Sequence, residues 1–197
     1  MIKRLTILVC FIFAFQVLVF AHSGRPKYHL IVDTDGAIDD FRAITMFLAM
    51  SDVRVLAITT SQGTLFPETS AIKVAALLQD FYNEGIPVGV GKLTDFELPV
   101  WSEFNKNIIW GENEKNIPID DFPKATDLLS STLKNYDYKV TLIALGALTT
   151  YADWLSENHD YISKVEKIIW YNDENIKSGF NYLADTSSFE TIKKALV

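Results

Sequence analysis

Four aspartates lie within eight residues, at positions 33, 35, 39 and 40, directly after a short apolar run. Carboxylates this close repel one another unless a cation neutralises them, and carboxylate oxygens are good ligands for hard divalent cations. Asp39 and Asp40 would also occupy the first turn of a following helix, where negative charge is favourable. The cluster therefore indicates a metal site, with helix capping by ordinary surface acids as the alternative.

Two other chemistries begin with a similar loop. An EF-hand calcium loop needs glycine at its sixth position, but Gly36 is the fourth residue counted from Asp33, so the spacing excludes it. A haloacid-dehalogenase-like phosphatase would use Asp33 to attack phosphate and Asp35 as acid and base. Ala37 stands where such phosphatases usually have threonine, and no later lysine with paired acids stands out. The phosphatase stays open as an alternative.

The elements that must position these acids alternate between strand and helix. Apolar runs predict five strands, at Tyr28–Asp33, Val53–Thr59, Ile86–Val90, Val140–Leu145 and Val165–Trp170. Helical periodicity predicts helices at Asp39–Met50, Glu68–Tyr82, Ala125–Leu133, about Leu148–Leu155 and Glu190–Leu196. Residues 91–121 have no clear period and are predicted to form a long loop. This alternation predicts an α/β fold with a mostly parallel sheet and flanking helices, which binds ligands beyond the carboxyl ends of its strands.

Residues 1–21 have the pattern of a secretory signal peptide. A short basic start is followed by the apolar run Leu5–Phe20 and by small residues that favour cleavage after Ala21. The mature chain would then be residues 22–197, with no membrane association after cleavage. We therefore expect a secreted or periplasmic protein.

The remaining composition restricts the classes of partner. Cys10 is the only cysteine and would leave with the signal, so no disulfide is expected. Loss of Lys3 and Arg4 with the signal would take the net charge from −7 to −9. An acidic chain without a basic stripe argues against nucleic acid as a partner.

Three segments carry a resemblance to a known family. Residues 31–40 resemble the Asp-x-Asp-x-x-x-Asp-Asp signature of the inosine-uridine-preferring nucleoside hydrolases. Residues 144–150 are similar to that family's Leu-Gly-Pro-Leu-Thr-Asn turn, and Phe180-Asn181 with Asp185 is similar to its Glu-Phe-Asn…Asp-Pro segment. The resemblance implies a Rossmann-like fold, Ca²⁺ as cofactor and a small nucleoside or glycoside as partner. Because family members are commonly oligomers, it also implies self-association.

The resemblance implies a separate role for each site residue. Asp35 would contact Ca²⁺ and act as general base on the attacking water, Asp40 would hold Ca²⁺, and Thr149 would offer its backbone carbonyl to the metal. Asp39 would bind ribose hydroxyls, and Asn181 would help to hold the sugar. The implied reaction is calcium-dependent hydrolysis of N-glycosidic bonds in ribonucleosides or related glycosides.

Departures from the family pattern support a second hypothesis. Family members continue beyond the position of Val197, so the resemblance implies that residues 22–197 lack the C-terminal part of the family fold and its late His-Asp pair. Gly179 also stands where the family has glutamate. The alternative is a non-catalytic or truncated relative that binds a sugar or nucleoside.

Two further expectations concern residues around the cluster. Asp33 would support the loop from behind by accepting backbone hydrogen bonds. Four aromatic residues either stack on a sugar or base or pack within the protein: Trp101, Trp110, Trp170 and Tyr171.

Overall fold

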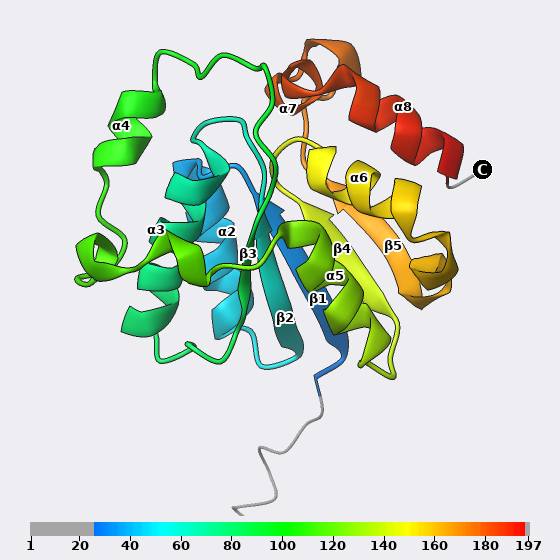
Figure 1. Cartoon of the computed structure of the whole chain (residues 1–197), viewed down its shortest axis with the longest axis horizontal. Helices are drawn as coiled ribbons and strands as arrows, with labels where there is room; N and C mark the ends of the chain where they lie inside the picture. Colours follow the sequence, from blue (N-terminus) through cyan, green and yellow to red (C-terminus); the bar gives the residue numbers. More distant parts are fainter. Residues whose placement is uncertain (1–25, 196–197) are drawn as a thin grey trace, which may run out of the picture.

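The computed structural model describes residues 26–195, apart from the side chain of His159. Five strands form a single sheet in the order β3-β2-β1-β4-β5, and every neighbouring pair is parallel (Figure 1). The strands are β1 (Tyr28–Thr34), β2 (Val53–Thr60), β3 (Val88–Val90), β4 (Val140–Ala144) and β5 (Val165–Trp170). The predicted α/β class with a parallel sheet is confirmed.

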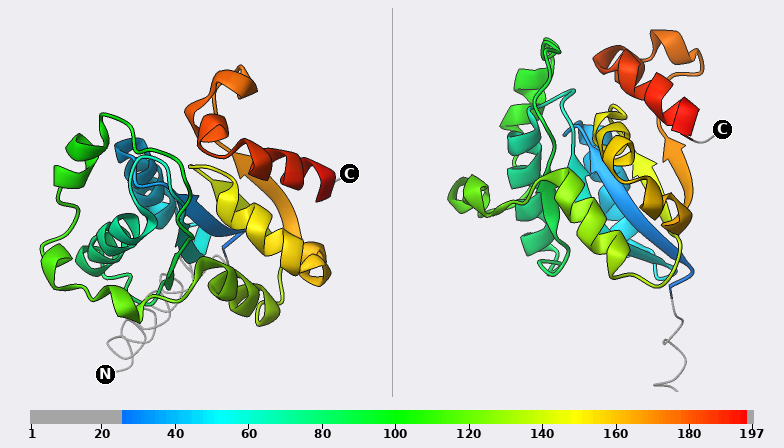
Figure 2. Two further views of the ribbon diagram at one scale, coloured as in Figure 1. Left: turned by 45° about the horizontal axis from the view of Figure 1, so that its top comes forward. Right: turned by 45° about the vertical axis from the view of Figure 1, so that its right-hand side comes forward.

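Helices cover both faces of this sheet. They are α2 (Ile38–Ala49), α3 (Pro67–Asp80), α4 (Ser102–Asn107), α5 (Ala125–Lys134), α6 (Thr149–Glu157), α7 (Phe180–Ala184) and α8 (Thr186–Ala195). Successive side chains of β1 point to opposite faces of the sheet and so into two different layers of the core. Val32 packs with Phe41 of α2, whereas Ile31 packs with Tyr151 of α6. Helices α2 and α3 therefore cover one face, and α5 and α6 cover the other (Figure 1). Helix α8 lies against α6 (Figure 2).

The structure corrects three of the predicted elements. The predicted loop at 91–121 contains helix α4 and short 3-10 turns at Glu114–Asn116 and Ile119–Asp121. A helix of six residues is too short to show a helical period, so α4 and the five-residue α7 were both missed. The last helix begins at Thr186 and not at Glu190, and β3 is shorter than predicted.

Two sequence predictions fall wholly or partly outside the described residues. The predicted signal peptide at 1–21 lies outside them, as does Leu196 at the end of the predicted last helix. Within residues 26–195, no helix is both long and apolar enough to cross a membrane.

The arrangement of β1 and β4 creates the place for a site. They are neighbours in the sheet, but the chain leaves β1 for a helix on one face and leaves β4 for a helix on the other. Chains that diverge in this way open a crevice beyond the carboxyl ends of the strands. Gly36 turns the chain from β1 into α2 with a φ of +86°, a left-handed conformation that favours glycine.

Candidate active site

A pocket of about 510 Å³ lies beyond the carboxyl ends of β1 and β4. It brings together four of the five predicted site residues, namely Asp35, Asp39, Asp40 and Asn181. Its other lining residues come from several segments: Ala37, Thr64, Trp101, Leu145, Tyr171, Asn172, Asp173 and Phe180. No lysine, arginine or histidine is among these lining residues, so the pocket is acidic and suits a neutral or cationic ligand.

Asp35 is buried at the floor of this pocket, with an exposed fraction of 2%. Its Oδ2 accepts hydrogen bonds from the backbone N–H of Thr64 at 3.0 Å and from the Thr64 hydroxyl at 3.3 Å. Its Oδ1 accepts a bond from the N–H of Ala37 at 3.2 Å. Burial raises the pKa of Asp35 despite these bonds. The carboxylate is therefore held in one orientation and ionises less readily than an exposed aspartate.

Thr64 was not identified from the sequence as a site residue. It follows β2, which is adjacent to β1, so its proximity to Asp35 follows from the strand order. That neighbour relation could have been used to find it. Gly63, immediately before it, permits the contact, because a Cβ at that position would overlap Oδ2 of Asp35.

Asp40 is buried beside Asp35 in the first turn of α2. Its Oδ2 accepts hydrogen bonds from the Thr34 hydroxyl at 2.7 Å and from the backbone N–H of Asp35 at 3.1 Å. Burial, and then the negative charge of Asp35, raise the pKa of Asp40 well above its ordinary value. Two carboxylates in one poorly solvated place require either a proton or a cation.

Asp39 and Asn181 lie on the walls of the same pocket. Asp39 is exposed, so its carboxylate is available to a ligand. The Asn181 Nδ2 donates hydrogen bonds to the carbonyls of Leu145 at 2.6 Å and Tyr171 at 2.9 Å. These two bonds join the segments that follow β4 and β5. Within the described part of the chain, the Asn181 Oδ1 accepts no hydrogen bond and remains available to a ligand.

Thr149, the fifth predicted residue, does not line this pocket. It begins α6, and its hydroxyl donates a hydrogen bond to Oδ2 of Asp185 at 2.8 Å. Burial alone would raise the pKa of Asp185, but hydrogen bonds from Ser188, Ser187 and Thr149 outweigh it and lower the pKa. Thr149 and Asp185 thus join α6 to the start of α8. The metal-binding role of the Thr149 carbonyl stays a prediction.

The expected role of Asp33 is wrong. Its side chain is fully buried, and among residues 26–195 neither carboxylate oxygen has a hydrogen-bond partner of normal geometry. Burial raises its pKa well above the ordinary value, although the hydroxyls of Thr150, Ser61 and Thr59 lie near enough to favour the charged form in part. Because side chains alternate along β1, the side chain of Asp33 points into the interior between the sheet and the helices. It therefore cannot reach the loop amides. Its burial also removes the phosphatase alternative, because that reaction needs an accessible nucleophile at Asp33.

The four aromatic residues divide between pocket and interior. Trp101 and Tyr171 line the pocket, where Trp101 contacts Phe180 with 5.4 Å between ring centroids. Trp110 instead stacks on Phe41, with 4.5 Å between the ring centroids and 10° between the ring planes. Trp170 donates its indole N–H to the carbonyl of Gly146. Packing therefore explains two of the four, and the other two contribute aromatic rings to the lining of the pocket.

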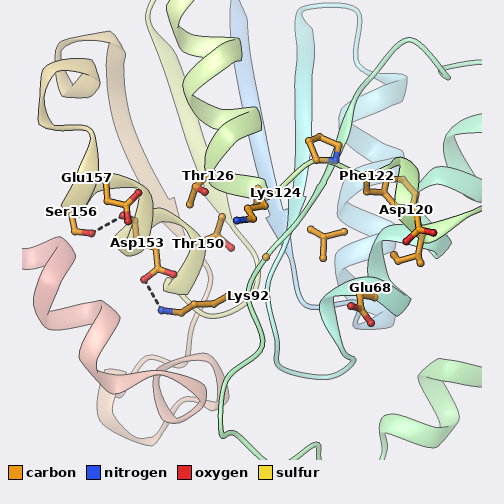
Figure 3. Close-up of a pocket in the computed structure, with 15 residues that line it drawn as sticks. Glu68, Lys92, Asp120, Phe122, Lys124, Thr126, Thr150, Asp153, Ser156 and Glu157 are labelled. Atoms are coloured by element: carbon orange, nitrogen blue, oxygen red, sulfur yellow. Dashed lines mark hydrogen bonds and ion pairs between the residues drawn. The ribbon is translucent and has the colours of Figure 1, made fainter.

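A second, larger pocket of about 720 Å³ is lined by α6, by the start of α5 and the segment before it, by residues 90–92 and by Glu68 of α3 (Figure 3). Lys92 and Asp153 point toward each other at its mouth and form an ion pair of 2.8 Å. Both partners are substantially exposed to solvent. None of the predicted site residues lines this pocket, so the candidate active site is the smaller one.

The donor set fits a hard cation only in part. Among the residues that the structure describes, no three His, Cys, Asp or Glu side chains form a metal cluster. Asp35 and Asp40 nevertheless form a buried pair of oxygen donors whose charges disfavour each other, which a divalent cation would relieve. Ca²⁺ usually takes six to eight oxygen ligands. Main-chain, water or ligand oxygens would therefore have to complete the coordination of a Ca²⁺ ion bound by this pair.

A model of the inosine-uridine preferring nucleoside hydrolase family matches residues 30–172, which include the aspartate cluster and the five strands apart from the first two residues of β1. The chain belongs to this family. It is 27% identical over 150 residues to a pyrimidine-specific ribonucleoside hydrolase of Shewanella sp. (strain MR-4), covering 74% of this chain and 46% of that protein. It is 28% identical over 148 residues to uridine nucleosidase 1 of Arabidopsis thaliana, covering 71% and 43%.

Solved structures agree with this family membership. A plant nucleoside hydrolase superposes with a TM-score of 0.69 and 26% identity, covering 86% of this chain and 57% of that one. The chain thus spans about half the length of the curated relatives that it matches.

Proposed function

We propose that this chain carries the metal- and ribose-binding part of a nucleoside hydrolase, which breaks the N-glycosidic bond of a ribonucleoside. The observation that carries the proposal is the buried pair Asp35 and Asp40 at the floor of a pocket that Asp39 and Asn181 also line. Family membership supports the same reaction. The proposed location outside the cytoplasm rests on residues 1–21 alone.

Asp35 is suited to the role of general base. Thr64 and Ala37 fix the orientation of its carboxylate, so a water in the pocket would meet an oxygen that is already positioned. Its raised pKa brings it nearer to neutrality, where a carboxylate takes a proton more effectively. The transition state of this reaction develops positive charge on the ribose, and the acidic pocket stabilises that charge.

Asp40 and Asp35 would hold the metal, with calcium as the ion that the family often uses. A calcium ion there would supply Lewis-acid chemistry, orienting sugar hydroxyls and making a water easier to deprotonate. Asp39, exposed on the wall, would accept hydrogen bonds from ribose hydroxyls, and the free Oδ1 of Asn181 would accept another. Trp101, with Phe180 against it, offers a flat apolar surface to the leaving base.

A direct assay tests this proposal. Release of ribose from uridine, inosine and cytidine is measured with the full chain and added Ca²⁺, beside the variants Asp35→Asn and Asp137→Asn. Asp137 is an exposed aspartate at the opposite end of the sheet and serves as the matched control. We expect turnover that Asp35→Asn abolishes and Asp137→Asn leaves unchanged. Absence of turnover by the parent chain on every nucleoside would refute the hydrolase proposal.

One observation favours a second function, binding without turnover. Gly179 stands where the family has glutamate, and the Asn172 side chain fills the space that a Cβ there would need. Asn172 accepts a hydrogen bond from the N–H of Tyr182 and donates one to the carbonyl of Ile176, so it closes its own loop. Nucleoside binding by calorimetry in the absence of turnover would favour this function.

A further inference from the structure

Helix α2, which carries Asp39 and Asp40, begins without a cap from its own sequence. Its N-cap residue is Ala37, which has no side chain able to accept a hydrogen bond. The first amides of a helix lack partners within the helix and need acceptors from elsewhere. The N–H of Ile38 donates to Oδ1 of Asn105 at 3.0 Å, and Asn105 lies 67 residues further along the chain.

Asn105 is held in the orientation that this bond requires. It is buried, and its Nδ2 donates to the carbonyl of Trp101 at 3.1 Å, so the amide oxygen is directed to Ile38. Both residues belong to residues 101–110, called the α4 segment because they contain α4, and Trp101 lines the pocket. One amide side chain therefore connects the aromatic lining of the pocket with the helix turn that bears its acids.

The α4 segment is itself anchored at two other points. The buried Lys73 of α3 donates to the carbonyl of Ile108 at 2.7 Å, one turn beyond Asn105. Trp110 stacks on Phe41 of α2. These contacts fix the position of the α4 segment, so Asn105 can hold the start of α2 in place.

We propose that Asn105 is a positioning residue that caps α2 from outside and fixes Asp39 and Asp40 relative to Trp101. Loss of a helix cap destabilises the first turn, and both aspartates lie in that turn. The capping role stands on geometry alone, whereas its importance for the metal and the sugar rests on the function proposed above. The inference adds a residue that neither the aspartate signature nor the pocket lining includes.

The test uses two substitutions at this position and one matched control. Asn105→Leu removes the acceptor at similar volume, and Asn105→Asp keeps an acceptor oxygen. Asn107→Leu alters a neighbouring asparagine whose side-chain Nδ2 donates to the carbonyl and carboxylate of Glu103. Hydrogen exchange of a peptide covering residues 38–41 is measured in metal-free full-length protein. We expect Asn105→Leu to speed this exchange about fivefold, the effect of a typical lost cap. Asn105→Asp and Asn107→Leu should stay within about twofold of the parent.

A second readout concerns the site itself. Ca²⁺ titration should show about fivefold weaker binding for Asn105→Leu, with affinity kept in Asn105→Asp. If Asn105 contributed only to general stability, Ca²⁺ binding would weaken in both Asn105 variants in proportion to the fall in their melting temperatures. If the parent neither binds Ca²⁺ nor turns over nucleosides, the function proposed above fails. The exchange measurement then decides the capping role alone.

Ile38→Pro tests the same hydrogen bond from its donor side. Proline fits the first position of a helix, and Ala37 already has the extended conformation that a residue before proline needs, with φ −70° and ψ 154°. This change removes the N–H that donates a hydrogen bond to Asn105. Asn105→Leu added to Ile38→Pro should then change the exchange of residues 39–41 by less than about twofold. Two outcomes would overturn the inference. One is that Asn105→Leu changes the exchange rate equally in the parent and in Ile38→Pro. The other is that Asn105→Leu alone exchanges at the rate of the parent.

Discussion

The backbone N–H of Asp35 donates a hydrogen bond to Oδ2 of Asp40 at 3.1 Å. One carboxylate of the site is therefore bonded to the main chain that carries the other, and the Thr34 hydroxyl binds the same oxygen at 2.7 Å. These bonds occupy Oδ2, and Oδ1 of Asp40 accepts no hydrogen bond from the described residues. These bonds hold the two residues together rigidly and leave Oδ1 of Asp40 available to a cation.

Asp40→Asn should weaken Ca²⁺ binding by about tenfold or more, because it removes one of two buried charges while leaving the shape of the site intact. Calorimetric titration measures the affinity, with Asp137→Asn as the control for loss of one negative charge. We also expect the parent chain to bind Ca²⁺ weakly, since two carboxylates and the Thr149 carbonyl are few ligands for this ion. Equal affinities in the parent and Asp40→Asn would remove Asp40 from the metal site.

Asp33→Asn should stabilise the metal-free protein at neutral pH. The Asp33 carboxyl is fully buried and has no hydrogen-bond partner of normal geometry in the described part of the chain, and an amide avoids the cost of burying a charge. The asparagine amide is still a buried polar group, but it stays neutral at every pH, so the melting temperature should rise by the part of the cost that comes from the charge. Thermal unfolding in the presence of a chelator measures it. A lower melting temperature for Asp33→Asn would show that the charge has a stabilising partner.

The stability of the metal-free protein should fall as the pH rises from about 4 towards neutral. Burial raises the pKa of Asp33, Asp35 and Asp40 above the ordinary value of 3.8. An acid whose folded-state pKa is raised loses its proton more easily in the unfolded chain, so unfolding is favoured above pH 3.8 and increasingly up to the folded-state pKa. Asp185, whose pKa is lowered, acts in the opposite sense below pH 3.8.

Urea unfolding across a pH series measures this dependence. Asp33→Asn should give a shallower slope than the parent, because one of the three acids no longer titrates. Identical slopes would mean that Asp33 ionises as readily in the folded chain as in the unfolded one.

Much of this architecture follows from the sequence, and the failures have physical causes. Strands that are buried on both faces, such as Val140–Ala144, have continuous apolar sequences, so they can be predicted without a structure. The aspartate cluster was placed correctly at a strand end. The position of Asn105 could not be predicted, because a contact between Asn105 and Ile38 depends on how a loop of irregular sequence folds back.

Gly63→Ala should disturb the site, whereas Gly85→Ala should not. A Cβ at position 63 would overlap Oδ2 of Asp35, and a Cβ at position 85 would meet nothing within 4 Å. Overpacking of this kind typically costs about 1–3 kcal/mol, while a substitution into open space changes stability by less than about 0.5 kcal/mol. Chemical unfolding measures both variants, and Ca²⁺ affinity should drop only in Gly63→Ala. Equal stability of the two would mean that Asp35 can move aside freely.

Lys73→Met should destabilise the protein strongly and loosen the α4 segment. Lys73 has a side-chain exposure of 1%, and its Nζ lies 2.7 Å from Oε1 of Glu114. Removal of one partner of a buried ion pair typically costs about 3–5 kcal/mol, because the remaining charge loses its counter-ion. Glu114→Gln added to Lys73→Met should therefore recover part of the loss.

Lys92→Met is the matched control, since Lys92 forms an ion pair of similar length with Asp153 in solvent. An exposed pair contributes about 0–1 kcal/mol, so this variant should unfold at nearly the same urea concentration as the parent. Hydrogen exchange at residues 101–110 should rise in Lys73→Met alone, because Lys73 also holds the Ile108 carbonyl. If both lysine variants lost the same stability, the Lys73 pair would be no more than a surface contact.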